Sequence, residues 1–213
     1  MNYLGVEPLK IYVIGDSISI QYGTYLESQL KGIMEYSRKG GIEEASVNFD
    51  HKTGANGGDS KMVLNHLQLI KEAGSIDADV IVVNCGLHDI KTDPGTKRKQ
   101  VEIDKYEENL FLIVNLIKDL PREMVWVRTT PCDEGIHNNS GVKFHRFSED
   151  CLEYNSVADR VMQLKNIPII DLHSFTSNLD EDLYCDHVHF HQSIRQQQAA
   201  YIAGCLSGLF SSH

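Results

Sequence analysis

The sequence lacks any long apolar segment. No run approaches the roughly 18 consecutive apolar residues that a transmembrane helix requires. The first eight residues also lack the basic start and the apolar stretch of a secretion signal. We therefore expect a protein that does not act in or on a membrane, and the cytoplasm is its expected location.

Positive charge is scarce as well. The chain has 20 Lys and Arg against 30 Asp and Glu, which gives a formal net charge of −10 when the histidines are neutral. Nucleic acids and anionic membranes bind proteins mainly through clustered cations that release counterions from phosphates. The basic run at 97–99 has only three residues, and a run this short usually faces solvent. The charge balance therefore argues against nucleic acid as a partner.

Cysteine is sparse and irregularly spaced. The chain has five cysteines and no C-x-x-C pair. An odd number without a regular spacing is typical of reduced thiols inside a cell. Internal repeats and low-complexity tracts are also lacking, and 213 residues suffice for one large hydrophobic core. We therefore expect a single domain spanning residues 1–213, and the sequence leaves its oligomeric state open.

Short apolar runs alternate with helical patterns along the chain. The runs have strand length and several are rich in Val and Ile. We expect strands at 9–14, 45–49, 79–84, 124–129 and 167–172. We expect helices at 18–33, 60–73, 148–165 and 192–209, and another in which apolar residues recur at three- and four-residue steps from Ile103 to Ile117. Because several of the runs are continuously apolar over most of their length, these strands are expected to be buried on both faces. The pattern predicts an α/β fold, a three-layer α/β/α sandwich around a five-stranded, mainly parallel sheet.

Polar segments follow four of the five expected strands. In an open parallel sheet, ligands bind at the carboxyl ends of the strands, so these segments are expected to converge. They are Gly15-Asp16-Ser17 and the segments 53–60, 85–89 and 186–189.

Two of these segments carry the groups that activate a serine nucleophile. Ser17 supplies a hydroxyl directly after the first strand, and Asp186 lies three positions before His189. A serine after a strand is usually a helix cap, so Ser17 alone would be uninformative. The combination with a late Asp-x-x-His and a glycine-rich turn favours nucleophilic catalysis.

In these segments and their order, the chain resembles the SGNH hydrolases, also called the GDSL esterase/lipase family. The resemblance runs from Gly15 to His189 and implies a flavodoxin-like sandwich. It assigns the nucleophile to Ser17, the base to His189 and the orienting carboxylate to Asp186. It also implies an oxyanion hole formed by the backbone N–H groups of Ser17 and Gly58.

One block departs from the family pattern. The family has Gly-x-Asn-Asp, in which the Asn amide donates to the oxyanion, whereas this chain has Gly86-Leu87-His88-Asp89. A neutral imidazole also has one N–H donor. We therefore expect His88 to be the third donor of the oxyanion hole.

These assignments predict a serine esterase that forms an acyl-serine intermediate. The expected substrate is a short-chain ester, most plausibly an acetyl ester, of a small molecule or carbohydrate. Two alternatives stay open at this point. One is an acyltransferase that passes the same acyl group to a sugar hydroxyl, and the other is a catalytically silent carbohydrate-binding module.

A long connection at 132–147 is expected to form either a lid or wall that selects the substrate or a flexible surface loop without such a role. Arg146, within this connection, is a candidate partner for a substrate carboxylate. His187, which lies outside it, is expected to line the pocket mouth or to face solvent. His187, His189 and His191 alternate, and with Asp186 they offer the ligand types of a zinc site. A metal at His189 would remove the base that serves Ser17, so we expect no metal and no other cofactor.

Overall fold

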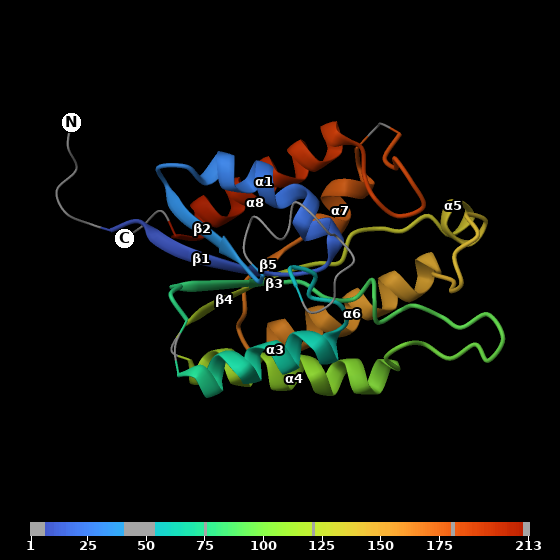
Figure 1. Ribbon diagram of the computed structural model, residues 1–213, viewed down its shortest axis with the longest axis horizontal. Helices are drawn as coiled ribbons and strands as arrows, with labels where there is room; N and C mark the ends of the chain where they lie inside the picture. The colour runs from blue at the N-terminus through green and yellow to red at the C-terminus, as the bar shows by residue number, and fades with distance from the viewer. Residues whose placement is uncertain (1–6, 41–53, 75, 121, 180–181, 211–213) are drawn as a thin grey trace.

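The computed structural model describes residues 7–40, 54–74, 76–120, 122–179 and 182–210. At its centre lies a sheet of five parallel strands in the order β2-β1-β3-β4-β5 (Figure 1). The strands are β1 (Leu9–Ile14), β2 (Met34–Arg38), β3 (Val80–Val83), β4 (Glu123–Val127) and β5 (Ile169–Ile170). The expected parallel sheet is thus confirmed.

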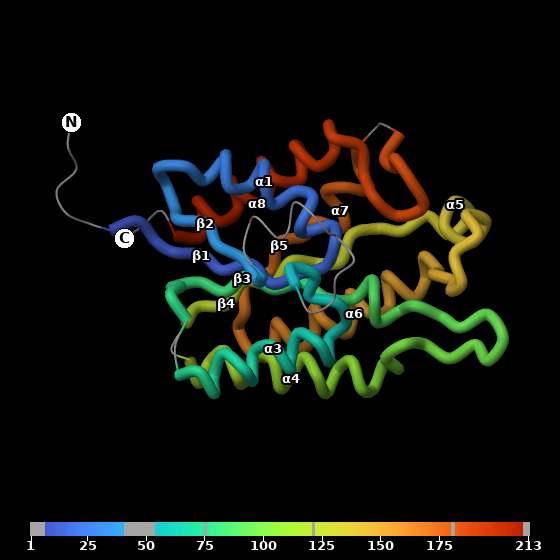
Figure 2. Tube along the Cα trace, in the orientation of Figure 1, coloured from blue at the N-terminus to red at the C-terminus, as the bar shows by residue number. Residues whose placement is uncertain are grey.

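Helices cover both faces of this sheet. They are α1 (Ser17–Leu30), α3 (Ser60–Ala73), α4 (Ile103–Asp119), α5 (Glu134–Asn138), α6 (Ser148–Leu164), α7 (Leu172–Ser177) and α8 (Gln192–Phe210). Helices α1, α7 and α8 lie on one side, and α3, α4 and α6 lie on the other (Figures 1 and 2). The predicted α/β/α sandwich is therefore the observed architecture.

The central strands form because their residues are apolar on both faces. All four residues of β3 are buried, which matches a strand covered by helices on each side. Helix α4 presents an apolar stripe to the sheet that includes the fully buried Tyr106, Leu110 and Ile113. The carboxyl ends of the strands then face the loops at the right of Figure 1.

The second strand differs from the prediction. Helix α1 ends at Leu30, three residues before the expected end, and Gly32 follows with a left-handed φ of +81°. The chain then forms β2, which pairs in parallel with β1 from Leu9 opposite Met34. Because β2 is an edge strand with the mixed sequence Met-Glu-Tyr-Ser-Arg, it lacks the apolar run of a buried strand. The strand predicted at 45–49 lies outside the described residues.

The fifth strand is shorter than predicted. Only Ile169–Ile170 pair with β4, and helix α7 begins at Leu172 inside the expected strand. The Asp171 carboxylate accepts a hydrogen bond from the Ser174 backbone N–H at 3.0 Å and so caps the new helix. Because of this cap, the chain forms a helix from Leu172 and not the extended strand that its apolar residues favour.

Candidate active site

The segments that follow β1 and β3 meet at the carboxyl edge of the sheet. The two strands are adjacent, with Ile14 opposite Val83. The glycine-rich segment before α3 lies at the same edge, because the Gly57 N–H donates to the carbonyl of Gly15, directly after β1, at 2.8 Å. Three segments distant in the sequence thereby share one edge.

Ser17 is the first residue of α1. The Asp16 carboxylate caps this helix by accepting from the Ile18 N–H at 3.0 Å. The backbone N–H of a first helical residue has no acceptor within its own helix, and the helix dipole makes this end attractive to negative charge. Ser17 is 8% exposed, so most of its surface is covered by the surrounding protein.

Asp186, His189 and Ser17 form a continuous chain of contacts. His189 Nε2 lies 3.0 Å from Ser17 Oγ, and His189 Nδ1 lies 2.7 Å from Asp186 Oδ2. The other Asp186 oxygen accepts the backbone N–H groups of Val188 at 2.8 Å and His189 at 2.7 Å. The backbone of the turn at 186–189 therefore holds the Asp186 carboxylate, and this carboxylate in turn orients the His189 ring.

The surroundings of Asp186 keep it ionised. Partial burial acts to raise the pKa of this carboxyl, but the backbone N–H groups of His189 and Val188 and the His189 ring outweigh it. The net result is a pKa lowered to about 2. An ionised Asp186 can hold the proton of His189 on Nδ1 and leave Nε2 as an acceptor for the serine proton.

Gly58 has a backbone conformation that favours glycine. Its φ is +68°, and a Cβ there would lie 2.5 Å from Met62 Sδ. The Gly58 N–H donates to the Asn56 side-chain oxygen at 2.8 Å. In this state Asn56, which is fully buried, thus occupies the donor that the family resemblance assigns to the oxyanion hole.

His88 lies in the turn after β3. It is 8% exposed, and its Nδ1 lies 3.2 Å from Lys91 Nζ. The next residue, Asp89, is fully buried and accepts the Ser60 backbone N–H with both oxygens, at 2.9 and 3.1 Å. Burial raises the pKa of Asp89 to about 8, although the bonds from Ser60 oppose this rise. Asp89 thus joins the turn of His88 to the start of α3.

Arg146 is buried and supports the turn of His88. It is 4% exposed, and its Nε donates to the Leu87 carbonyl at 2.7 Å. One of its terminal nitrogens lies 3.5 Å from His137 Nδ1. Direct contact between Arg146 and a substrate remains a prediction, because the described contacts are to the protein itself.

His187 packs against the long connection at 132–147. Its Nδ1 lies 2.9 Å from His137 Nδ1, and His137 is completely buried. Burial is the main reason that the pKa of His137 is lowered to about 4. A role of His187 in substrate binding stays a prediction. The connection, which contains α5, therefore contacts both the turn of His88 and the segment that carries His189.

Two basic residues that the sequence analysis did not select hold the site together. The guanidinium of Arg38 donates to the carbonyls of Ser19 at 3.0 Å and Ala55 at 3.3 Å. The adjacent Lys39 donates to the carbonyls of Gly54 and Asn56. Both side chains are buried at the end of β2. They could not be found because the strand that positions them was not predicted.

The described residues contain no group of three or more His, Cys, Asp and Glu side chains arranged for a metal ion. The rings of His187 and His189 are 6.2 Å apart. His191 turns elsewhere, with its Nε2 3.7 Å from Asp182. In the part of the chain described, no helix is both long and apolar enough to cross a bilayer.

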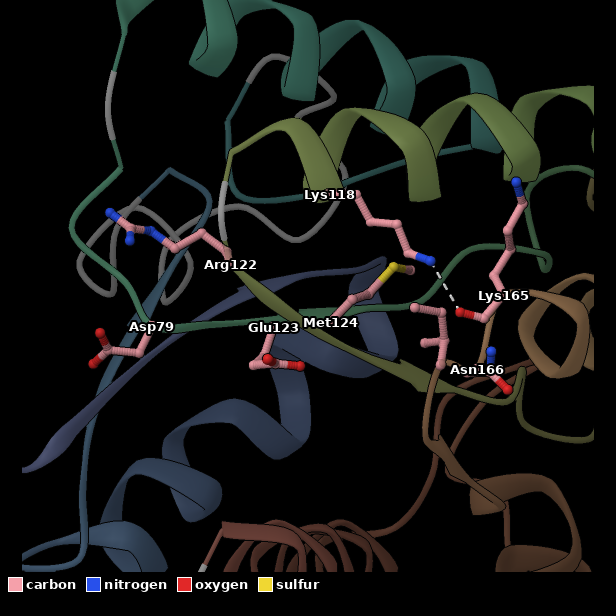
Figure 3. Close-up of a pocket in the computed structure, with 8 residues that line it drawn as sticks. Asp79, Lys118, Arg122, Glu123, Met124, Lys165 and Asn166 are labelled. Carbon is pink, nitrogen blue, oxygen red and sulfur yellow. Dashed lines mark hydrogen bonds between the residues drawn. The ribbon is translucent and has the colours of Figure 1, made fainter. Parts of the chain in front are cut away.

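A separate cavity of about 590 Å³ lies at the opposite edge of the sheet (Figure 3). It is found at the amino ends of β3 and β4. Asp79 directly precedes β3, and Glu123 is the first residue of β4. Lys118 Nζ donates to the Lys165 carbonyl at 3.0 Å across it. Among the described residues, its lining includes both cations and carboxylates but no serine, cysteine or histidine. This cavity therefore lies apart from Ser17, Asp186 and His189.

No family model and no curated protein matches the sequence. Among solved structures, the chain is similar to a lipase/acylhydrolase from Enterococcus faecalis, with 19% identity, a TM-score of 0.69 and coverage of 94% of this chain and 96% of the other. It is also similar to a member of the lipolytic protein G-D-S-L family from Veillonella parvula, with 14% identity, a TM-score of 0.63 and coverage of 96% and 99%. A third similar structure is Est24, a carbohydrate acetylesterase from Sinorhizobium meliloti, with 13% identity, a TM-score of 0.61 and coverage of 95% and 100%. At these identities the comparison establishes the shared fold.

Proposed function

We propose that this chain, which has the fold of the SGNH hydrolases, is a serine esterase that removes a short acyl group from a small-molecule or carbohydrate ester. The observation that carries the proposal is the contact of 3.0 Å between His189 Nε2 and Ser17 Oγ, with Asp186 on the other side of the ring. Fold alone does not imply activity, so the proposal depends on this site.

In the first half of the reaction, Ser17 Oγ attacks the ester carbonyl while His189 Nε2 accepts the hydroxyl proton. Asp186 stabilises the imidazolium and keeps its ring oriented. The imidazolium then donates its proton to the departing alcohol, which leaves an acyl group on Ser17. In the second half, His189 takes a proton from water while the water oxygen attacks the acyl carbonyl. The bond between the acyl carbon and Ser17 Oγ then breaks, the acid leaves, and His189 returns the proton to Ser17 Oγ.

The oxyanion would be stabilised by three donors at the same edge. The Ser17 N–H gains from its place at the start of α1. The second donor is the Gly58 N–H, which turns from Asn56 Oδ1 to the substrate or is shared between them. The third donor is the imidazole of His88. Loss of one such donor typically costs about 2.7–4 kcal/mol of transition-state stabilisation.

The proposed substrate class rests on the long connection at 132–147. The connection at 132–147 is rich in polar residues, among them Asn138, Asn139 and Ser140, and it contacts the segments that carry His88 and His189. Such a wall suits a hydroxylated alcohol component more than a lipid. Est24, whose structure is similar, is a carbohydrate acetylesterase, which agrees with this choice.

The activity is tested with p-nitrophenyl acetate and with a fluorophosphonate that labels activated serines. The wild type is expected to hydrolyse the ester and to take up one label per chain, whereas Ser17→Ala should do neither. Ser28→Ala is the matched control, because Ser28 lies exposed on the same helix. Hydrolysis by Ser17→Ala at the wild-type rate would reject the proposal.

His88 is tested separately. His88→Ala is expected to lower kcat by about 100-fold or more if the ring donates to the oxyanion. His88→Asn places an amide donor at the same position and should restore much of the rate. Unchanged kcat in the alanine variant would remove His88 from the oxyanion hole.

A further inference from the structure

We infer that Lys91 is a positioning residue that sets which nitrogen of His88 carries the proton. The inference rests on the proposed role of His88 in the oxyanion hole. An imidazole can replace an amide donor only if an N–H, and not a lone pair, faces the oxyanion. The contact between Lys91 Nζ and His88 Nδ1 supplies this selection.

The chemistry of the pair leaves one arrangement. An ammonium group has three donors and no acceptor, so at 3.2 Å it can only donate to a ring nitrogen that has a lone pair. His88 Nδ1 is therefore the acceptor and is unprotonated. A neutral imidazole carries its single proton on the other nitrogen. Lys91 thereby selects the form in which Nε2–H is the donor.

The ammonium group is itself held in place. Lys91 Nζ lies 4.7 Å from the centre of the Phe144 ring, a cation–π distance. The backbone of Lys91 is also fixed, since its carbonyl accepts the Gln100 N–H at 2.8 Å and its N–H donates to the His88 carbonyl at 3.3 Å. The contact with His88 thus does not depend on a freely rotating surface lysine.

The same ring connects this pair to the long connection at 132–147. The Arg146 guanidinium lies 5.1 Å from the centre of the Phe144 ring and donates to the Leu87 carbonyl. Arg146 therefore supports the backbone immediately before His88, while Lys91 orients the side chain. This protein has His88 where the SGNH family has an Asn amide donor, and its Lys91 and Arg146 provide contacts that orient the His88 ring.

The protonation of His88 is measured directly by 15N NMR of the imidazole. In the wild type we expect Nδ1 to have the shift of an unprotonated nitrogen and Nε2 that of an N–H nitrogen. In Lys91→Glu the carboxylate accepts from Nδ1–H, so the pattern should reverse. A protonated Nδ1 in the wild type at neutral pH would overturn the inference. This measurement needs no activity, so it stands even if Ser17 proves not to be a nucleophile.

Kinetics test the consequence. Lys91→Met is unbranched, one atom shorter than lysine, and has no donor, and we expect kcat to fall about tenfold with little change in KM. Lys91→Gln is as long as the methionine variant but has an N–H donor, and it should stay within about threefold of wild type. Lys105→Met is the control, because Lys105 is an exposed lysine on α4 that pairs with Glu108.

A double variant separates positioning from a general structural role. In the His88→Asn background there is no imidazole to orient, so adding Lys91→Met should change kcat by less than about twofold. An equal loss of kcat in both backgrounds would show that Lys91 supports the fold and not the protonation of His88. Equal rates for Lys91→Met and Lys91→Gln would also contradict the inference.

Discussion

Ser17 Oγ and His189 Nε2 lie 3.0 Å apart although 172 residues separate them in the chain. The sheet brings Ser17 to the carboxyl end of β1, and the segment before α8 returns His189 to the same edge. A contact this short between a hydroxyl and an imidazole permits proton transfer without a large rearrangement.

Replacement of the orienting carboxylate is expected to be severe. In Asp186→Asn the amide can donate to His189 Nδ1 and stabilise the wrong tautomer, so kcat should fall by about 10³–10⁴-fold. Steady-state hydrolysis of p-nitrophenyl acetate measures the loss. Asp182→Asn is the control, since its 85% exposed side chain lies 3.7 Å from His191 and should leave kcat within about twofold. Near-normal kcat in Asp186→Asn would separate Asp186 from the catalytic machinery.

Asp89 is expected to make stability depend on pH. Its folded pKa of about 8 lies above its ordinary value of 3.8, so the native state keeps a proton that the unfolded state releases. Its contribution is fully present below about pH 4 and is lost as pH rises toward 8, with a slope of at most about 1.4 kcal/mol per pH unit. Asp89→Asn remains neutral and should lack this loss.

The test compares urea unfolding of the wild type and Asp89→Asn between pH 5 and pH 8. The free energy of unfolding of the variant should rise relative to that of the wild type as pH increases. Because other groups titrate equally in both proteins, only the difference between them is informative. A difference that stays constant across this range would contradict the raised pKa of Asp89.

The guanidinium of Arg38 is expected to stabilise the site and the fold together. Arg38→Met removes donors to the Ser19 and Ala55 carbonyls and should lower the free energy of unfolding by about 2–4 kcal/mol. The rate of ester hydrolysis should fall as well, since Arg38 no longer connects the start of α1 to the segment before Gly58. Thermal unfolding and ester hydrolysis measure the two effects.

Arg160→Met is the matched control for Arg38. The Arg160 side chain is 57% exposed and pairs with Glu107 on the surface, so its loss should change stability by about 0.5 kcal/mol or less. Equal effects of the two substitutions would mean that burial of the guanidinium at β2 is unimportant.

Gly57 is expected to tolerate no side chain. A Cβ at this position would lie 2.9 Å from the Gly15 carbonyl oxygen, which already accepts the Gly57 N–H. Gly57→Ala should therefore separate the two segments, with a loss of about 1–3 kcal/mol in stability and at least about tenfold in kcat/KM. Gly204→Ala in α8 meets no atom within 4 Å and should instead stabilise the protein by about 0.5–1 kcal/mol. Similar kinetics for both variants would argue against close packing at Gly57.

The buried part of the sheet was predictable because continuous apolar runs are typical of strands covered on both faces. This applies to β1, β3 and β4. The edge strand β2 was missed because its exposed side admits polar residues such as Glu35 and Ser37. The end of β5 was missed because Asp171 caps a helix there, an interaction that an apolar pattern does not reveal.

The candidate chemistry was also visible in part. Ser17, Asp186 and His189 could be selected because their residue types, order and neighbouring glycine-rich turn suit nucleophilic catalysis. The sequence could not show that the Gly58 N–H is engaged by Asn56, that Arg38 and Lys39 clamp the same segment, or that Lys91 contacts His88. These relations join residues from different segments and depend on side-chain geometry.

By itself the sequence determined the kinds of groups available and the order of most elements, because burial imposes apolar runs on strands and periodic stripes on helices. The tertiary structure decided which groups meet. Strand pairing places the ends of β1 and β3 side by side, and hydrogen bonds then set the distance between Ser17 and His189 and the partner of His88. Local residue preferences act over a few positions, whereas these distances result from contacts across the whole sheet.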